Sequence, residues 1–163
     1  MTTPPILLIC DLDEQLLRDP PSLEQLRGWI TIHRAKIKLV YSTSAPIECV
    51  RFLTDIQKIE PPDFVIGCGG TEVDCFAAGG EVTGWLELIP REWDSAKVRK
   101  VLATFPELEL QSESMQSRHR VRYYLDRASP RQILQIEVTL ATAGLEADLS
   151  YVGSQFLDVV PCG

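Results

Sequence analysis

The chain has 163 residues, the length of one ordinary domain or of a small domain with an insertion. Apolar residues make up 45% of it and charged residues 24%, as in soluble globular proteins. The formal net charge of −7 argues against nucleic acid as a general partner, because phosphate backbones are bound by clustered positive charge. A short basic run between Arg118 and Arg127 suits a small anionic ligand better than a polymer.

The cysteines and histidines follow no metal-binding or disulfide pattern. Five cysteines are scattered through the sequence without a CxxC pair, and the two histidines stand apart. We therefore expect no zinc site, and we expect reduced thiols. The N-terminus lacks a charged region followed by a long apolar stretch, so the sequence predicts neither a signal peptide nor a membrane span. These features favour a cytoplasmic location.

Two aspartates follow the first apolar run of the chain. Ile6 to Cys10 predicts a short strand of a parallel sheet, buried on both faces, and Asp11 and Asp13 come directly after it. In an open α/β sheet, ligands bind beyond the carboxyl ends of the strands. Two carboxylates on alternate residues suit Mg²⁺, or a nucleophile paired with an acid. The alternative is a solvated strand end without a function.

The next elements alternate between helix and strand. In chain order they are a helix over 23–34 with Ser22 as its N-cap, a strand over 37–41, a helix over 46–59 and a strand over 64–66. Short connections between them predict right-handed crossovers and a parallel sheet.

The second half of the chain predicts a smaller α/β module with an antiparallel sheet. Its expected elements are a hairpin turn at 79–80, a helix over 92–105, strands over 108–111 and 121–125, a helix from Ser129-Pro130 to about 143, and extended segments over 149–152 and 156–160. Gly144 fits the position just past the end of the second helix. Tyr123 and Tyr124 lie on opposite faces of their strand, which places one of them in the core.

Six motifs, taken in order, resemble the haloacid dehalogenase superfamily and, within it, the sucrose-phosphate phosphatases. The motifs are Asp11-Leu12-Asp13; Leu39 to Thr43; Pro62 to Ile66; Gly70-Thr71-Glu72; the set Trp93, Gln111 and His119 to Asp126; and Phe156 to Pro161. The resemblance spans essentially the whole chain. It implies a truncated Rossmann-like parallel-sheet core over 1–72, with a returning strand over 155–163. It also implies an inserted α/β cap module over 73–154.

The resemblance also implies roles for single residues. Asp11 would be the nucleophile that takes the phosphoryl group, and Asp13 would protonate the leaving sugar oxygen and later activate water. Thr43 would donate a hydrogen bond to the phosphoryl oxygens. Mg²⁺ would be held by Asp11 and by the backbone carbonyl of Asp13.

Three polar residues of the later motifs match positions where the resemblance suggests contacts with a phosphorylated sugar. They are Glu72, Gln116 and Arg120. The alternative for each is a solvated face beside an apolar segment.

The chain departs from the family pattern near the aspartates and at its end. Glu14-Gln15 and Ser44-Ala45 replace the small, threonine, glycine and arginine residues that are usual in the family. The lysine and the acidic loop that follow the family's proline have no counterpart after Pro161, because the sequence given stops at Gly163.

These departures leave three interpretations open. The chain is a weak Mg²⁺-dependent phosphatase, a catalytically lapsed relative that acts as a binding or regulatory subunit, or a piece of a longer protein. An incomplete core would also leave a sheet edge or face open, so we expect a homodimer or a partner subunit, unless the cap-like module covers it.

Overall fold

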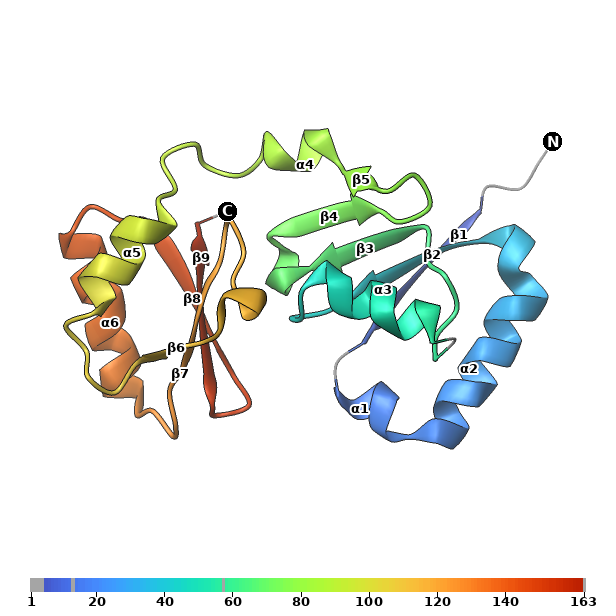
Figure 1. Ribbon diagram of the computed structural model, residues 1–163, viewed down its shortest axis with the longest axis horizontal. Helices are drawn as coiled ribbons and strands as arrows, with labels where there is room; N and C mark the ends of the chain where they lie inside the picture. Colours follow the sequence, from blue (N-terminus) through green and yellow to red (C-terminus); the bar gives the residue numbers. More distant parts are fainter. Residues whose placement is uncertain (1–4, 13, 57, 163) are drawn as a thin grey trace. The chain divides into compact units, whose positions relative to one another are not determined.

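The computed structural model describes residues 5–12, 14–56 and 58–162, and the chain divides into two compact units. Unit 1 is Met1–Thr83 and unit 2 is Gly84–Gly163 (Figure 1). Each unit has its own sheet and its own hydrophobic core, which confirms the expected α/β class. In the described ranges, no helix is both long and apolar enough to cross a bilayer.

Unit 1 is built on a five-stranded sheet with the order β1-β2-β3-β4-β5. Its elements are β1 (Ile6–Asp11), α1 (Glu14–Arg18), α2 (Pro20–His33), η1 (Arg34–Lys36), β2 (Ile37–Ser42), α3 (Ile47–Asp55), β3 (Phe64–Gly67), η2 (Cys68–Gly70), β4 (Glu72–Cys75) and β5 (Gly80–Glu81). Strands β1, β2 and β3 are parallel, which confirms the prediction, whereas β4 and β5 are antiparallel.

The ends of the two longer helices of unit 1 differ from the sequence prediction. Asp19, not Ser22, caps α2, because the Asp19 carboxylate accepts hydrogen bonds from the Ser22 backbone N–H (3.5 Å) and hydroxyl (2.6 Å). Pro20 and Pro21 fill the first turn, where a missing N–H costs little. Helix α3 ends at Asp55, and the backbone N–H of Lys58 then closes a turn onto the Leu53 carbonyl at 2.8 Å.

One face of the unit 1 sheet carries the core. Leu39, Tyr41 and Val65 pack there with Ile30 of α2 and Val50 of α3, so both helices cover the same face. The expectation that the first strand is buried on both faces is wrong.

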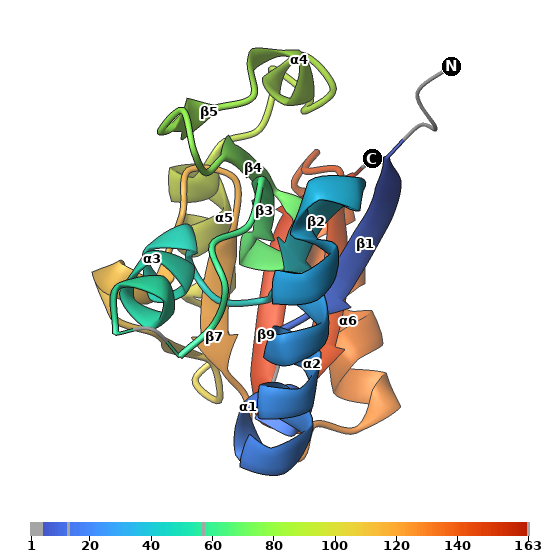
Figure 2. The same ribbon diagram turned by 90° about the vertical axis from the view of Figure 1, so that its right-hand side faces the viewer.

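Strand β1 has a second, open side. Leu7 and Ile9 are 61% and 56% exposed, while Leu8 and Cys10 pack against the core. In the part of the chain that the structure describes, β1 pairs on one side only, with β2 (Figure 2). Alternate residues of an edge strand that has helices on one face remain open to solvent.

Unit 2 contains a four-stranded sheet with the order β6-β7-β9-β8, in which every pairing is antiparallel. Its elements are α4 (Thr83–Leu86), which begins at the boundary, α5 (Ser95–Leu102), β6 (Glu109–Leu110), η3 (Glu113–Met115), β7 (Val121–Tyr124), α6 (Pro130–Thr142), β8 (Ala147–Val152) and β9 (Phe156–Pro161). The predicted antiparallel module is therefore confirmed.

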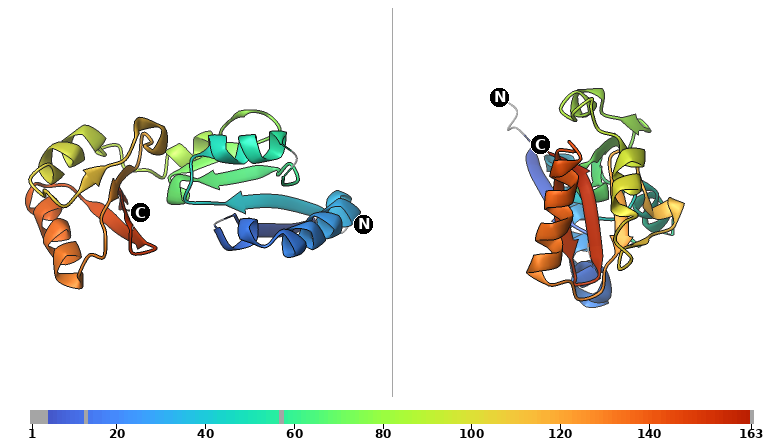
Figure 3. Two further views of the ribbon diagram at one scale, coloured as in Figure 1. Left: turned by 60° about the horizontal axis from the view of Figure 1, so that its bottom comes forward. Right: turned by 90° about the vertical axis from the view of Figure 1, so that its left-hand side faces the viewer.

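Helices α5 and α6 lie on one side of this sheet (Figures 1 and 3). Helix α6 begins with a capping box, in which the side chains of Ser129 and Gln132 bond to each other's backbone N–H. Gly144 follows its end with a φ of +69°, which glycine adopts without strain. Tyr123 is 4% exposed and Tyr124 48%, which confirms that one of the two lies in the core.

The structure divides the chain at other places than the predicted boundaries at 72 and 155. The hairpin of β4 and β5 continues the first sheet as far as Glu81. The last strand, β9, pairs with β7 and β8 of the second sheet. In the structure, residues 156–161 therefore belong to the sheet of unit 2.

Candidate functional site

The carboxyl ends of three strands lie level with one another in unit 1. Asp11 of β1 pairs with Ser42 of β2, and Ser42 pairs with Ile66 of β3. The register continues past the strand ends, since the Leu12 N–H donates to the Ser42 carbonyl at 2.8 Å. Asp11 and the loop that follows Ser42 therefore lie on one edge, where α/β sheets bind ligands.

Thr43 is held rigidly at this edge. It is 7% exposed, and its backbone N–H donates to the Ile66 carbonyl at 2.9 Å. Its Oγ1 accepts a hydrogen bond from the Ala45 N–H at 3.0 Å, and its carbonyl accepts one from the Gly69 N–H at 3.2 Å. These hydrogen bonds fix the turn from both sides.

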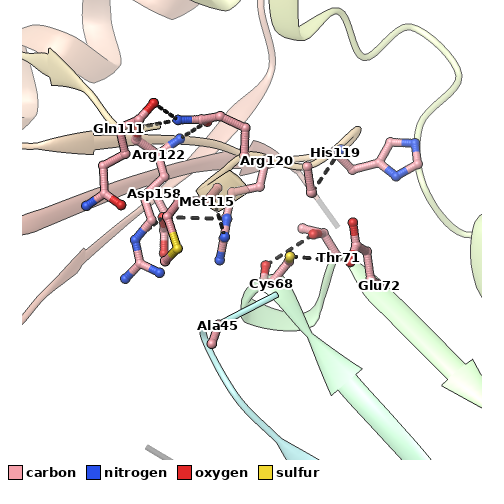
Figure 4. Close-up of polar contacts among 12 residues, drawn as sticks. Ala45, Cys68, Thr71, Glu72, Gln111, Met115, His119, Arg120, Arg122 and Asp158 are labelled. Atoms are coloured by element: carbon pink, nitrogen blue, oxygen red, sulfur yellow. Dashed lines mark hydrogen bonds and ion pairs between the residues drawn. The ribbon is translucent and has the colours of Figure 1, made fainter. Parts of the chain in front are cut away.

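A glycine-rich turn after β3 positions Glu72. The backbone φ angles of Cys68, Gly69 and Gly70 are +52°, +68° and +95°, a run that glycine makes accessible. The Thr71 hydroxyl donates to the Cys68 carbonyl at 3.1 Å, and the Cys68 thiol donates to Glu72 Oε2 at 3.3 Å (Figure 4). Glu72 pairs with Gly67, which is the last residue of β3. Glu72 therefore lies at the same edge of the sheet as Thr43.

The second predicted aspartate, Asp13, lies outside the described residues. Asp11 itself is exposed at the end of β1. Among the described residues, no group of three or more His, Cys, Asp or Glu side chains could hold a metal ion. A carboxylate oxygen is a hard donor, and Mg²⁺ often binds through one or two carboxylates while keeping several waters, so Asp11 fits that ion chemically.

Two of the predicted site residues belong to unit 2, and the first is held by backbone contacts. The amide nitrogen of Gln116 donates to the carbonyls of Gln111 and Arg122, both at 2.9 Å. Its amide oxygen accepts from the Arg122 N–H at 2.8 Å. Gln116 therefore fastens the segment before β7 to the sheet, and its contact with a sugar stays a prediction.

Arg120 is fully buried within the chain, at 0% exposure. Its Nη2 donates to the Met115 carbonyl at 2.8 Å, and its Nε lies 3.8 Å from Asp158 Oδ1 (Figure 4). Arg122 Nε lies 3.3 Å from the same oxygen. Burial raises the pKa of Asp158 above its usual value, although the two guanidinium groups act against that shift.

Sequence reasoning did not single out Asp158. The available signal was an isolated carboxylate inside the apolar strand Phe156 to Val160. Such a residue is almost never buried without a charged partner, so it predicts a buried ion pair. The structure thus brings Asp11, Thr43 and Glu72 to one edge of unit 1, and it places Gln116 and Arg120 in unit 2.

Solved structures of known proteins share this fold. The sucrose-phosphatase of Synechocystis sp. PCC6803, solved in complex with sucrose and phosphate, is 24% identical and has a TM-score of 0.87. That match covers 98% of this chain and 65% of that chain. A haloacid dehalogenase-like hydrolase from Bacteroides thetaiotaomicron has a TM-score of 0.67 at 14% identity, over 98% of this chain and 72% of that chain. The fold is therefore that of the haloacid dehalogenase class.

Sequence comparison defines the family within that class. Residues 4–163 match the family model described as sucrose-6F-phosphate phosphohydrolase, so the chain belongs to this family. Probable sucrose-phosphatase 2 of Arabidopsis thaliana is 29% identical over 170 residues, which are 100% of this chain and 40% of that protein. Mannosylfructose-phosphate phosphatase of Agrobacterium fabrum is 23% identical over 157 residues, or 95% of this chain and 63% of that protein.

These comparisons confirm the resemblance found in the motifs. They also show that the chain is shorter than its relatives, since it spans about two fifths of the plant sucrose-phosphatases that it matches.

Proposed function

We propose that this chain belongs to a sugar-phosphate phosphatase that uses Asp11 as its nucleophile. The position of Asp11 is the observation that carries the proposal: an exposed carboxylate at the carboxyl end of β1, in register with Ser42 and next to the turn of Thr43. The family match over 4–163 supports the substrate class, and sucrose 6-phosphate is its leading member.

The proposed reaction has two steps. In the first, a carboxylate oxygen of Asp11 forms a bond to phosphorus while the bond from phosphorus to the sugar oxygen breaks, and Asp13 gives its proton to that oxygen. In the second, Asp13 takes a proton from water, and the water oxygen displaces Asp11 from phosphorus to release phosphate. The Thr43 hydroxyl donates a hydrogen bond to a phosphoryl oxygen in both steps.

Mg²⁺ is the cofactor that we propose, held by the Asp11 carboxylate and the Asp13 carbonyl. When bound, it would neutralise the charge of the phosphate that faces the Asp11 carboxylate. The contacts of Glu72, Gln116 and Arg120 with the sugar are part of the same proposal.

The test is phosphate release from sucrose 6-phosphate and from other sugar phosphates in the presence of Mg²⁺. We expect turnover that falls at least about a thousandfold in Asp11→Asn, because the replacement amide cannot act as the nucleophile. Asp126→Asn is the matched control, since the side chain of Asp126 is 77% exposed in unit 2, and it should keep full activity.

The alternative, a catalytically lapsed binding or regulatory subunit, predicts a different result. A folded wild-type chain would then bind sucrose 6-phosphate in calorimetry and release no phosphate. Absence of both binding and turnover would contradict the two proposals together.

We further propose a homodimer that pairs through the open edge of β1. Ile6, Leu7 and Ile9 are exposed there, and an uncharged apolar edge strand is a template for pairing with another chain. Light scattering after size exclusion should give a dimer that Ile9→Lys converts to monomer. Ile32→Lys is the matched control, because Ile32 is 80% exposed and belongs to helix α2, not to a strand of the sheet.

A further inference from the structure

Unit 2 contains a pocket of about 450 Å³ that the proposed phosphatase chemistry does not use. Its wall comes from residues between Leu86, the last residue of α4, and Ser95, the first residue of α5, and from Arg118 and His119 just before β7. The volume lies within the range of pockets that bind small molecules. All of its lining residues belong to unit 2.

The charged groups at this pocket favour an anion. Arg91 and Arg118 are exposed, and neither forms an ion pair with another of the residues that the structure describes. His119 lines the same pocket and is 8% exposed. Asp94 is the one carboxylate of the lining, and its Oδ1 already accepts the Lys97 N–H at 3.0 Å as the N-cap of α5. The lining thus has two arginines and one carboxylate, although the whole chain has a net charge of −7.

The apolar part of the lining favours a ligand with a ring. Trp93, Leu86 and Ile89 supply it. The indole N–H of Trp93 donates to the Arg118 carbonyl at 3.0 Å, and the ring packs against the core of unit 2. The indole is therefore held in place, and its N–H already has an acceptor. The part of the side chain that can contact a ligand is the carbon surface of the ring. The same hydrogen bond ties the backbone of Arg118 to the apolar wall.

The pocket is distinct from the buried charges around Asp158. Figure 4 shows the imidazole of His119 turned away from the guanidinium of Arg120, although the two residues are adjacent in the chain. The Arg120 guanidinium bonds to the Met115 carbonyl and is fully buried. Arg120 and Asp158 are not among the residues that line the pocket.

We propose that this pocket is a binding site for a small organic phosphate. The phosphate group lies between Arg91 and Arg118, whose planar guanidinium groups present paired donors to its oxygens. The ring of the ligand lies against Trp93 and Leu86. The proposed site includes no residue of unit 1, and binding there does not depend on catalysis at Asp11.

The experiment uses the full chain carrying Asp11→Asn, so that a sugar phosphate is not consumed. Sucrose 6-phosphate, inorganic phosphate and sucrose are titrated by calorimetry at low salt. The same titrations are followed by NMR through the indole N–H signal of Trp93, which Trp93→Phe identifies by its loss. Arg91→Gln combined with Arg118→Gln tests the site. Arg127→Gln combined with Arg131→Gln is the matched control, with the same change of charge in the same unit.

We expect sucrose 6-phosphate to shift the Trp93 signal and to bind more tightly than either inorganic phosphate or sucrose. The Arg91/Arg118 variant should bind at least about tenfold more weakly, since each arginine supplies charged hydrogen bonds, while the Arg127/Arg131 variant keeps the wild-type affinity. Higher salt should weaken binding to the chain.

Three results would overturn the proposal. They are a Trp93 signal that no ligand moves, an equal loss of affinity in both arginine pairs, and equal affinity for inorganic phosphate and sucrose 6-phosphate. Phosphate release by the chain without Asp11→Asn decides the proposed function separately, so failure of one proposal can be told from failure of the other.

Discussion

The two units place a strand aspartate in opposite surroundings. Asp11 ends a parallel strand and is exposed, whereas Asp158 lies within β9 at 3% exposure, between Arg120 and Arg122. The polar ends of parallel strands meet at one open edge, so a carboxylate there can reach a ligand. A carboxylate in the interior of the unit 2 sheet cannot reach solvent or a ligand in this way. Its charge is therefore stable there only if charged groups of the protein lie beside it. The comparison is consistent with the chemical role that we propose for Asp11, and it indicates a structural role for Asp158.

The largest effect on stability should come from Asp158→Asn. This change removes the carboxylate that two buried guanidinium groups approach, which costs about 3–5 kcal/mol of the free energy of unfolding. Urea denaturation of the variant measures it. Asp11→Asn and the exposed Asp148→Asn should each stay within about 0.5 kcal/mol of the wild type. Equal losses in all three variants would contradict the division of roles.

A third aspartate, Asp63, extends the comparison to pH. Burial raises the pKa of Asp63, but hydrogen bonds from Lys38, the Leu39 N–H and Arg34 outweigh it and hold the pKa at about 2. An unfolded aspartate has a pKa near 3.9, so this group contributes stability above about pH 4 and loses it as the pH falls towards 2.

The loss amounts to about 2 kcal/mol at full protonation. Denaturation midpoints measured between pH 5 and pH 2 should show it in the wild type, and the dependence should be weaker in Asp63→Asn. The exposed Asp55→Asn is the control, and it should keep the wild-type pH profile.

The smallest effect concerns the cap of α6. Ser129→Ala removes the hydroxyl that accepts the Gln132 N–H at 3.3 Å, and it should cost about 1 kcal/mol of the free energy of unfolding. Ser150→Ala, at an exposed position of β8, should change it by less than about 0.5 kcal/mol. Calorimetric unfolding of both variants distinguishes them. An unchanged midpoint in Ser129→Ala would show that the stability of unit 2 does not depend on this cap.

Local signals in the sequence were sufficient for much of the fold. The apolar runs of β1, β2 and β3 and the Ser129-Pro130 start of α6 follow from periodicity and capping, which act over a few residues. The positions of Asp11 and Thr43 at the carboxyl ends of their strands were equally predictable, because Asp11 is the last residue of β1 and Thr43 follows β2 directly. Burial was harder to predict: β1 has the composition of a central strand, yet Leu7 and Ile9 are exposed, since exposure depends on which strands and helices pack beside it.

The sequence by itself determined the class of fold, the order of the elements and the family, because each is encoded in short motifs and their order. Only the tertiary structure decided that β9 pairs with β7 and β8, that Asp158 lies between two arginines, and that Trp93 and Arg118 line one pocket. These pairings join residues that are far apart in the chain, such as Arg122 and Asp158. Their energies arise from burial and charge in the folded protein, which no local pattern contains.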